Sequence, residues 1–238
     1  MPPSGPRIGI VDSGVAPALR RRLAAETRVL LRQDGSVGRS AAMDDAIGHG
    51  SEIARIILDL APAAALVSAQ AFTDSRTVDA GVVAEGIAWC LEQGARIINL
   101  SLGLRADKAA LRRACERARA SGALLVAAFP ARGDAVYPAA YPGVLAVSGD
   151  ARCTAENWSV LAAGRLVGAA TAAATAAANS AADGATQGGA SYAAARLSGL
   201  AARFFSAWPR ADAQDCLAWL ESDAAFRGRE CRSPARAA

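Results

Sequence analysis

Histidine and lysine are nearly absent from this sequence. Among 238 residues there is one histidine, His49, and one lysine, Lys108, so any reaction that needs an imidazole base has a single candidate. Aromatic residues amount to 5% of the chain and do not alternate with the arginines that give it a net charge of +4. Such arginines are typical of solvated helix faces, and we expect no nucleic-acid partner.

Long apolar segments are absent too. The longest uncharged small-residue run, residues 166–178, is too short and too weakly apolar to span a bilayer. The first residues do not combine a basic region, an apolar region and a cleavage site, so we predict no signal peptide, and no propeptide is recognisable. These absences favour a cytoplasmic protein without membrane contact.

The cysteines neither pair nor cluster. An odd number of them without metal-like spacing indicates reduced thiols rather than a disulfide framework, and it argues against a zinc site. We therefore predict no cofactor and no metal. The five cysteines are Cys90, Cys115, Cys153, Cys216 and Cys231.

The sequence does contain a regular alternation of short apolar segments and amphipathic ones. The strands among them are apolar throughout instead of alternating, as parallel strands buried on both faces are. The fold class that follows is α/β, a doubly wound, mostly parallel sheet flanked by helices. Strands are predicted at residues 7–11, 28–32, 65–72, 95–102 and 123–129, and helices at 16–26, 51–60, 78–94, 107–122 and 188–202.

No linker-like break divides the chain. We expect a single domain over residues 1–238, with a core at about 7–222 and a C-terminal tail at about 223–238. The stretch 169–189 is of low complexity, and we expect parts of it to be mobile.

Polar residues fall where such a sheet carries its site, at the carboxyl ends of strands. Asp12 follows the first strand, and Asn99 lies in the segment INLSLG. Each candidate also has an ordinary structural explanation, because Asp12 suits a turn, His49 a helix start and Ser191 a helix N-cap.

Taken together, the segments resemble a known family. IVDSGV (10–15), GHGSEIA (48–54) and GASYAAARLSGLAA (189–202) resemble, in the same order, the aspartate, histidine and serine motifs of the subtilisin-like serine peptidases. INLSLG (98–103) resembles the family's substrate-binding strand, and VYPAAYPGVLAVSG (136–149) resembles another family segment. The resemblance implies a subtilisin-like fold and a serine endopeptidase.

It also implies catalytic roles. Ser191 would attack a peptide carbonyl and form an acyl-enzyme, His49 would take the proton and return it to the leaving amine, and Asp12 would orient the imidazole. No acidic loop indicates the structural calcium ion that the family often binds.

The substrate-binding residues implied by the resemblance form two groups. The first would pair an extended substrate backbone as an added strand, and the second would line the pocket for the residue before the scissile bond. The first group is Ser101, Leu102 and Gly103, and the second is Ala128 and Phe129.

One departure from the family concerns the oxyanion. The family reads AAGN where this chain has Phe129, Pro130 or Ala131, and none of these supplies the asparagine amide. In subtilisin, loss of that donor lowers turnover by about 10²- to 10³-fold. We therefore expect a slow enzyme dedicated to one peptide or protein, such as one that removes the leader of a ribosomally made peptide. A protein partner could complete its site.

Two alternatives stay open. A pseudopeptidase would keep the fold as a peptide-binding module or as a subunit of a complex. A non-proteolytic serine hydrolase would use the same three residues on another acyl group.

Overall fold

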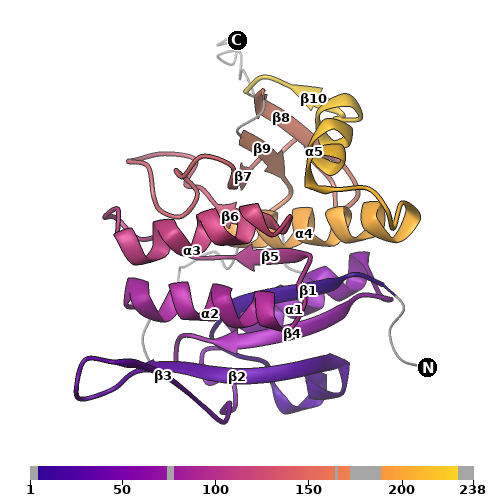
Figure 1. Cartoon of the computed structure of the whole chain (residues 1–238). Coiled ribbons are helices and arrows are strands. Elements are labelled where there is room, and N and C mark those ends of the chain that lie inside the picture. Colours follow the sequence, from indigo (N-terminus) through magenta and orange to yellow (C-terminus); the bar gives the residue numbers. More distant parts are fainter. Residues whose placement is uncertain (1–4, 74–77, 164–165, 172–188, 230–238) are drawn as a thin grey trace, which may run out of the picture.

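The computed structural model describes residues 5–73, 78–163, 166–171 and 189–229 (Figure 1). Within these residues, ten strands form one sheet in the order β10-β8-β9-β7-β6-β5-β1-β4-β2-β3. The strands are β1 (Arg7–Asp12), β2 (Leu23–Leu31), β3 (Val37–Ser40), β4 (Ala65–Gln70), β5 (Ile97–Leu100), β6 (Leu124–Ala128), β7 (Leu145–Gly149), β8 (Trp158–Ala162), β9 (Leu166–Ala169) and β10 (Phe226–Arg227). The helices are η1 (Pro17–Arg22, a 3-10 helix), α1 (His49–Leu60), α2 (Ala80–Glu92), α3 (Ala109–Ala120), α4 (Ala190–Ala207) and α5 (Ala213–Ser222).

The helices cover both faces of the sheet. In Figure 1, α2 and α3 lie side by side on the near face, and α1 and α4 lie behind the sheet. Two apolar cores result: Ile8 and Ile10 of β1 face the α1 and α4 side, and Val11 faces α2. The described strand pairs are parallel except β2 with β3 and β8 with β9. The predicted doubly wound, mostly parallel sheet is thus confirmed.

The helix predicted at 16–26 is wrong. The chain forms only the 3-10 helix η1, none of whose residues is buried, and β2 already starts at Leu23 and pairs in parallel with β4. The three arginines that end η1 leave Leu19 as the residue by which it packs against the core, whereas joining the sheet satisfies the backbone of the residues that follow.

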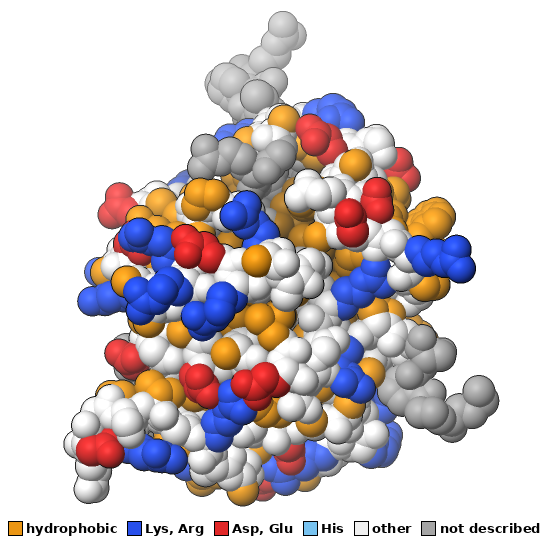
Figure 2. All heavy atoms as spheres, in the orientation of Figure 1, with side chains coloured by type: hydrophobic (Ala, Val, Ile, Leu, Met, Phe, Trp, Pro, Cys, Tyr) orange, Lys and Arg blue, Asp and Glu red, His pale blue; other side chains and the backbone are white. Residues whose placement is uncertain are grey.

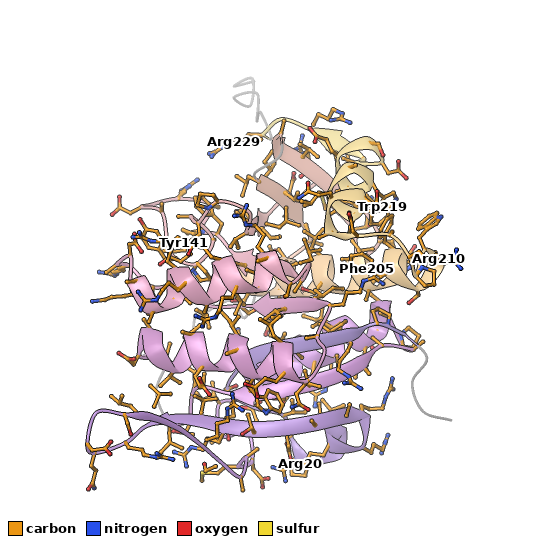
Figure 3. The ribbon with its side chains drawn as sticks, viewed as in Figure 1. Arg20, Tyr141, Phe205, Arg210, Trp219 and Arg229 are labelled. Carbon is orange, nitrogen blue, oxygen red and sulfur yellow. The ribbon has the colours of Figure 1, made fainter. Side chains whose placement is uncertain are left out.

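The predicted tail begins too early. β10 lies within residues 223–238, and Phe226 and Arg227 pair with Ser159 and Val160 of β8. The helix before it is fixed by aromatic contacts, since the ring of Trp219 on α5 lies 4.6 Å from that of Trp158 and 5.1 Å from that of Phe204 (Figure 3). The ordered sheet therefore continues past residue 222.

The surface in view mixes charges of both signs. Figure 2 shows basic and acidic side chains interspersed over the face formed by α2 and α3. On α3 the buried residues are apolar and the arginines point outward, as the amphipathic pattern predicts. No helix in the described part of the chain has the length and hydrophobicity to cross a membrane. Most of the low-complexity stretch predicted to be mobile lies outside the described residues.

Candidate active site

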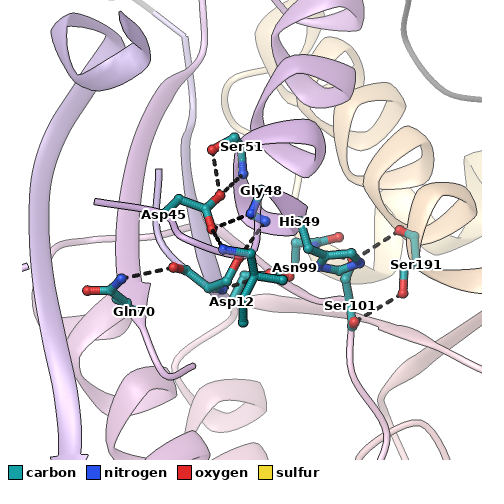
Figure 4. Close-up of polar contacts among 12 residues, drawn as sticks. Asp12, Asp45, Gly48, His49, Ser51, Gln70, Asn99, Ser101 and Ser191 are labelled. Atoms are coloured by element: carbon teal, nitrogen blue, oxygen red, sulfur yellow. Dashed lines mark hydrogen bonds and ion pairs between the residues drawn. The ribbon is translucent and has the colours of Figure 1, made fainter. Parts of the chain in front are cut away.

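Three elements bring Asp12, His49 and Ser191 to one place. Asp12 is the last residue of β1, His49 the first of α1 and Ser191 the second of α4. Nδ1 of His49 lies 2.7 Å from Oδ1 of Asp12, and all three residues line one cavity of about 450 Å³ (Figure 4). The structure thus assembles the acid, base and hydroxyl that the sequence predicts, from positions 179 residues apart at the extremes (191 − 12).

The carboxylate of Asp12 is fixed by burial and by two donors. Its residue is 1% exposed, and Oδ1 accepts a hydrogen bond from the Ser13 N–H at 2.7 Å as well as from His49. A carboxylate can only accept here, so Nδ1 of His49 carries the proton and Nε2 is the ring nitrogen that can accept one. This is the tautomer that a general base toward a serine hydroxyl requires.

Asp45 holds the start of α1, a role that the sequence analysis missed. Oδ1 of Asp45 accepts from the Gly48 N–H at 2.8 Å, and Oδ2 accepts from the N–H and hydroxyl of Ser51 at 2.9 and 2.5 Å. The first amides of a helix lack intrahelical partners, and Asp45 satisfies them from outside the helix. An aspartate four residues before the helix start (49 − 45) was the available signal.

Gly50 is required by close packing. A Cβ at this position would lie 2.2 Å from the carbonyl oxygen of Gly14, and the Gly50 N–H donates to Oγ of Ser13 at 2.8 Å. The helix that carries His49 therefore sits directly on the turn after Asp12, which fixes the distance between the side chains of Asp12 and His49.

A buried network joins the serine to β5. Oγ of Ser191 donates to the carbonyl oxygen of Ser101 at 3.1 Å, and Oγ of Ser101 donates to the carbonyl oxygen of Ser191 at 3.0 Å. The amide nitrogen of Asn99 donates to Oγ of Ser101 at 2.9 Å, and Oγ of Ser198 donates to Oδ1 of Asn99 at 3.1 Å. Asn99 and Ser198 are completely buried, so this chain ties the first and third turns of α4 to one strand end.

The start of α4 faces the cavity. The N–H groups of Tyr192 and Ala193 bond to the Gly189 carbonyl, and among the described residues no acceptor is recorded for the Ser191 N–H. A free N–H at a helix N-terminus is suited to stabilising developing negative charge. The ring of Tyr192 stacks on His49 with centroids 6.3 Å apart, another contact that the sequence did not indicate.

The loop after β6 offers no comparable donor. The Phe129 N–H is used by the Val147 carbonyl at 2.7 Å, and Pro130 has no N–H. Residues 131–134 are exposed, and their side chains form no hydrogen bond with another described residue. Positions 129 and 130, where the family has glycine and asparagine, therefore present neither a free N–H nor a side-chain amide.

Ser101, Leu102 and Gly103 line the cavity, whereas Ala128 and Phe129 are not among its described lining. Ala128 is buried in the core, and Phe129 is half-buried. The role of these two residues in a pocket for the substrate stays a prediction. The sequence analysis did not identify the remaining lining residues, which are Ser13, Ile47, Phe72, Val78, Leu104 and Arg105.

No competing nucleophile or metal cluster accompanies the three residues in the described part of the chain. Burial raises the pKa of the thiols of Cys115 and Cys216 to about 12, and it raises those of Cys90 and Cys153 as well. Within the described residues, no three histidine, cysteine or acidic side chains are grouped to hold a metal ion. The chemistry available is that of a serine, a histidine and a carboxylate.

Known proteins resemble this chain in sequence. The chain is 30% identical over 156 residues to a thermostable alkaline protease of Halalkalibacterium halodurans, a match that covers 61% of this chain and 41% of that protein. It spans between 23% and 55% of the first three curated relatives that it matches.

Solved structures share the fold. A lanthipeptide protease superposes with a TM-score of 0.70 at 17% identity, over 92% of this chain and 80% of that one. The prenylagaramide maturation protease PagA superposes with a TM-score of 0.62 at 21% identity, over 86% of this chain and 77% of that one. The profile of the Subtilase family matches residues 3–233, and the chain therefore belongs to the subtilase family.

Proposed function

We propose that this protein is a serine endopeptidase. Ser191 Oγ attacks a peptide carbonyl, the C–O bond forms as the proton passes to Nε2 of His49, and that proton leaves with the amine when the peptide bond breaks. Water then attacks the acyl-enzyme by the same route and releases the new carboxyl group. Asp12 holds the imidazole and stabilises its charged form throughout.

One observation carries the proposal. The buried carboxylate of Asp12 lies 2.7 Å from His49 Nδ1, in the cavity that Ser191 also lines. A lone histidine at a helix start has many structural uses, but a histidine oriented by a buried carboxylate beside a helix-terminal serine is an arrangement for acyl transfer.

Hydrolysis of a mixed peptide library tests the proposal. In water enriched in the heavy oxygen isotope, each hydrolysis places one heavy oxygen atom in the new carboxyl terminus. Mass spectrometry detects this label, and peptide ligation does not produce it. We expect products with the wild type and none with Ser191→Ala. Ser206→Ala is the matched control, since Ser206 lies on the same helix and bonds only to the Ala202 carbonyl at 2.8 Å. Cleavage by Ser191→Ala would refute the assignment.

We propose further that the enzyme is slow and processes a specific peptide or protein, as in leader removal from a ribosomally made peptide. Two observations support this: Phe129 and Pro130 after β6 have neither a free N–H nor a side-chain amide, and the structural neighbours include a prenylagaramide maturation protease and a lanthipeptide protease. Such an enzyme would act in the cytoplasm, with which the four buried free thiols among the described residues are consistent.

A pseudopeptidase is the second candidate. The hydroxyl of Ser191 donates to the Ser101 carbonyl at 3.1 Å, a resting contact that would have to break before attack, and Pro130 cannot donate to an oxyanion. This candidate predicts peptide binding that is equal in the wild type and Ser191→Ala, with no cleaved product in the library from either protein. A product from the wild type alone excludes it.

A further inference from the structure

The cavity beside Ser191 combines apolar walls with one cation. Its described lining includes the side chains of Ile47, Phe72, Val78, Leu102 and Leu104, together with the guanidinium-bearing Arg105. The only carboxylate in that lining is Asp12, which is buried and bonded to His49. The cavity is therefore suited to apolar side chains and carries a positive charge that no other residue of its described lining neutralises.

Arg105 differs in this respect from neighbouring arginines. Arg112 pairs with Asp107, and Arg152 pairs with Asp150 at 2.7 Å. Arg105 is exposed, and within the described residues it has neither an ion pair nor a hydrogen bond. An Arg guanidinium binds carboxylates through a rigid set of donors, so a free one at the edge of a substrate cavity is a recognition group for an acid.

The position of Arg105 along the chain sets which substrate residue it meets. Ser101 contacts Ser191, and the segment runs away from it to Leu104, whose backbone bonds to Tyr137 in both directions. Four residues of extended chain cover at most about 14 Å. With a substrate strand paired along Ser101–Gly103 and its acyl side there, Arg105 would lie beside the second to fifth residues before the scissile bond.

We propose that Arg105 determines specificity by binding an acidic substrate side chain two to five residues before the cleaved bond. The apolar walls of the same cavity take a neighbouring aliphatic or aromatic side chain. The substrate class is thus a peptide segment with one apolar and one acidic residue on the N-terminal side of the cleavage site. This inference rests on the proposed endopeptidase function for its kinetic readout.

The experiment uses peptides derived from a sequence cleaved in the library, with Glu, Gln or Lys at each of these four positions in turn. At one position we expect kcat/KM for Glu to exceed that for Gln by about threefold in low salt and to approach it in 1 M salt. Arg105→Gln should abolish the preference, and Arg105→Glu should reverse it toward Lys. A preference that persists in Arg105→Gln, or that is absent from the wild type, would overturn the proposal.

Arg113→Glu is the control for net charge. Arg113 is an exposed residue of α3 outside the cavity lining, and its substitution changes the charge by the same amount as Arg105→Glu. It should leave the order of the peptides unchanged, and a reversal with Arg113→Glu would refute a local role for Arg105.

Binding separates this inference from the proposed function. Fluorescence anisotropy with Ser191→Ala needs no catalysis and uses peptides that this variant retains from the library, carrying the same Glu, Gln and Lys replacements. It should show the same preference for Glu, lost with Ser191→Ala/Arg105→Gln. If the wild type cleaves nothing but this preference is found, the proposed function fails and the acid-recognition site stands. If cleavage is seen without any charge preference, the recognition site fails and the function stands.

Discussion

The two sides of Ser191 differ in how completely they carry the groups that acyl transfer needs. On one side, Asp12 and His49 are fixed by burial, by the Asp45 cap of α1 and by the close contact of Gly50 with Gly14. On the other, Phe129 and Pro130 after β6 have neither a free N–H nor a side-chain amide. The chain thus has the groups that move a proton and lacks the family's asparagine amide, and the proposed slow turnover, limited by charge stabilisation, is what the following changes test.

The largest loss of activity is expected from a change on the side of Asp12 and His49. His49→Ala removes the only imidazole in the chain and should lower kcat/KM for peptide hydrolysis by about 10⁴- to 10⁶-fold, since the residues of such a triad act as a unit. Steady-state hydrolysis of a cleaved peptide measures this. A loss of less than tenfold would show that His49 is not the base.

Adding an oxyanion donor to the loop after β6 should raise activity. Phe129→Gly/Pro130→Asn restores the family's residues and should raise kcat by about 10-fold or more, because one added oxyanion donor changes turnover by about 10²- to 10³-fold when the geometry is good. Phe129→Gly/Pro130→Ala controls for loop flexibility. An equal gain in both variants would attribute the effect to the loop and not to the amide.

The network behind the serine should show a smaller effect. Ser198→Ala removes the donor to Asn99 and leaves a buried oxygen unpartnered, which costs about 1 to 3 kcal/mol of stability. Because Asn99 holds Ser101 against Ser191, we expect kcat to fall about threefold to tenfold with KM unchanged. Ser206→Ala, on the same helix, should change neither quantity, and unchanged kcat in Ser198→Ala would make the network purely structural.

The segment around Asp150, which follows the loop after β6, is held by an ion pair. Measuring its contribution to stability shows whether the two sides of Ser191 differ in chemistry or in folding stability. Hydrogen bonds from Arg152 first, and then Ser159, lower the pKa of Asp150 from 3.8 to about 2. A lowered folded-state pKa stabilises the protein fully above about pH 4, and that contribution is lost as pH falls toward 2.

Asp150→Asn should therefore lower the free energy of unfolding near pH 7 by about 2 kcal/mol, with the difference shrinking below about pH 4. Denaturant unfolding at several pH values measures it, and kcat at neutral pH should stay unchanged. A pH-independent difference would contradict the ion-pair explanation, and a large fall in kcat would mean that the region controls the site directly.

The sequence predicted the fold class and the central elements because their signals were local and redundant. The apolar strands of the sheet centre and the helix predicted at 51–60 could be read from periodicity, and glycines such as Gly94 and Gly122 do adopt the positive φ values of helix ends. Strands outside the sheet centre, among them β3, β8 and β10, and the helix α5 were not predicted. The helix expected at 16–26 was wrong because pairing with β4 decides that segment, and partners 42 to 43 residues away (70 − 28 and 66 − 23) leave no local pattern.

The site was predictable in part for the same reason. Asp12, His49 and Ser191 stand in short motifs whose order is recognisable. Asp45 bonds within its own segment, to Gly48 and Ser51, and its place just before the helix was a signal that could have been used. Arg105 lines the cavity because distant segments meet there, so only the structure shows its position.

The central claim is that the Asp12–His49 pair activates Ser191. The rate of labelling by a fluorophosphonate, with the adduct located by mass spectrometry, tests it directly because the reagent needs an activated serine and no peptide recognition. The account predicts one adduct, on Ser191, formed in the wild type and at least about 10²-fold more slowly in His49→Ala. No adduct in the wild type, or equal rates in the two proteins, would contradict it.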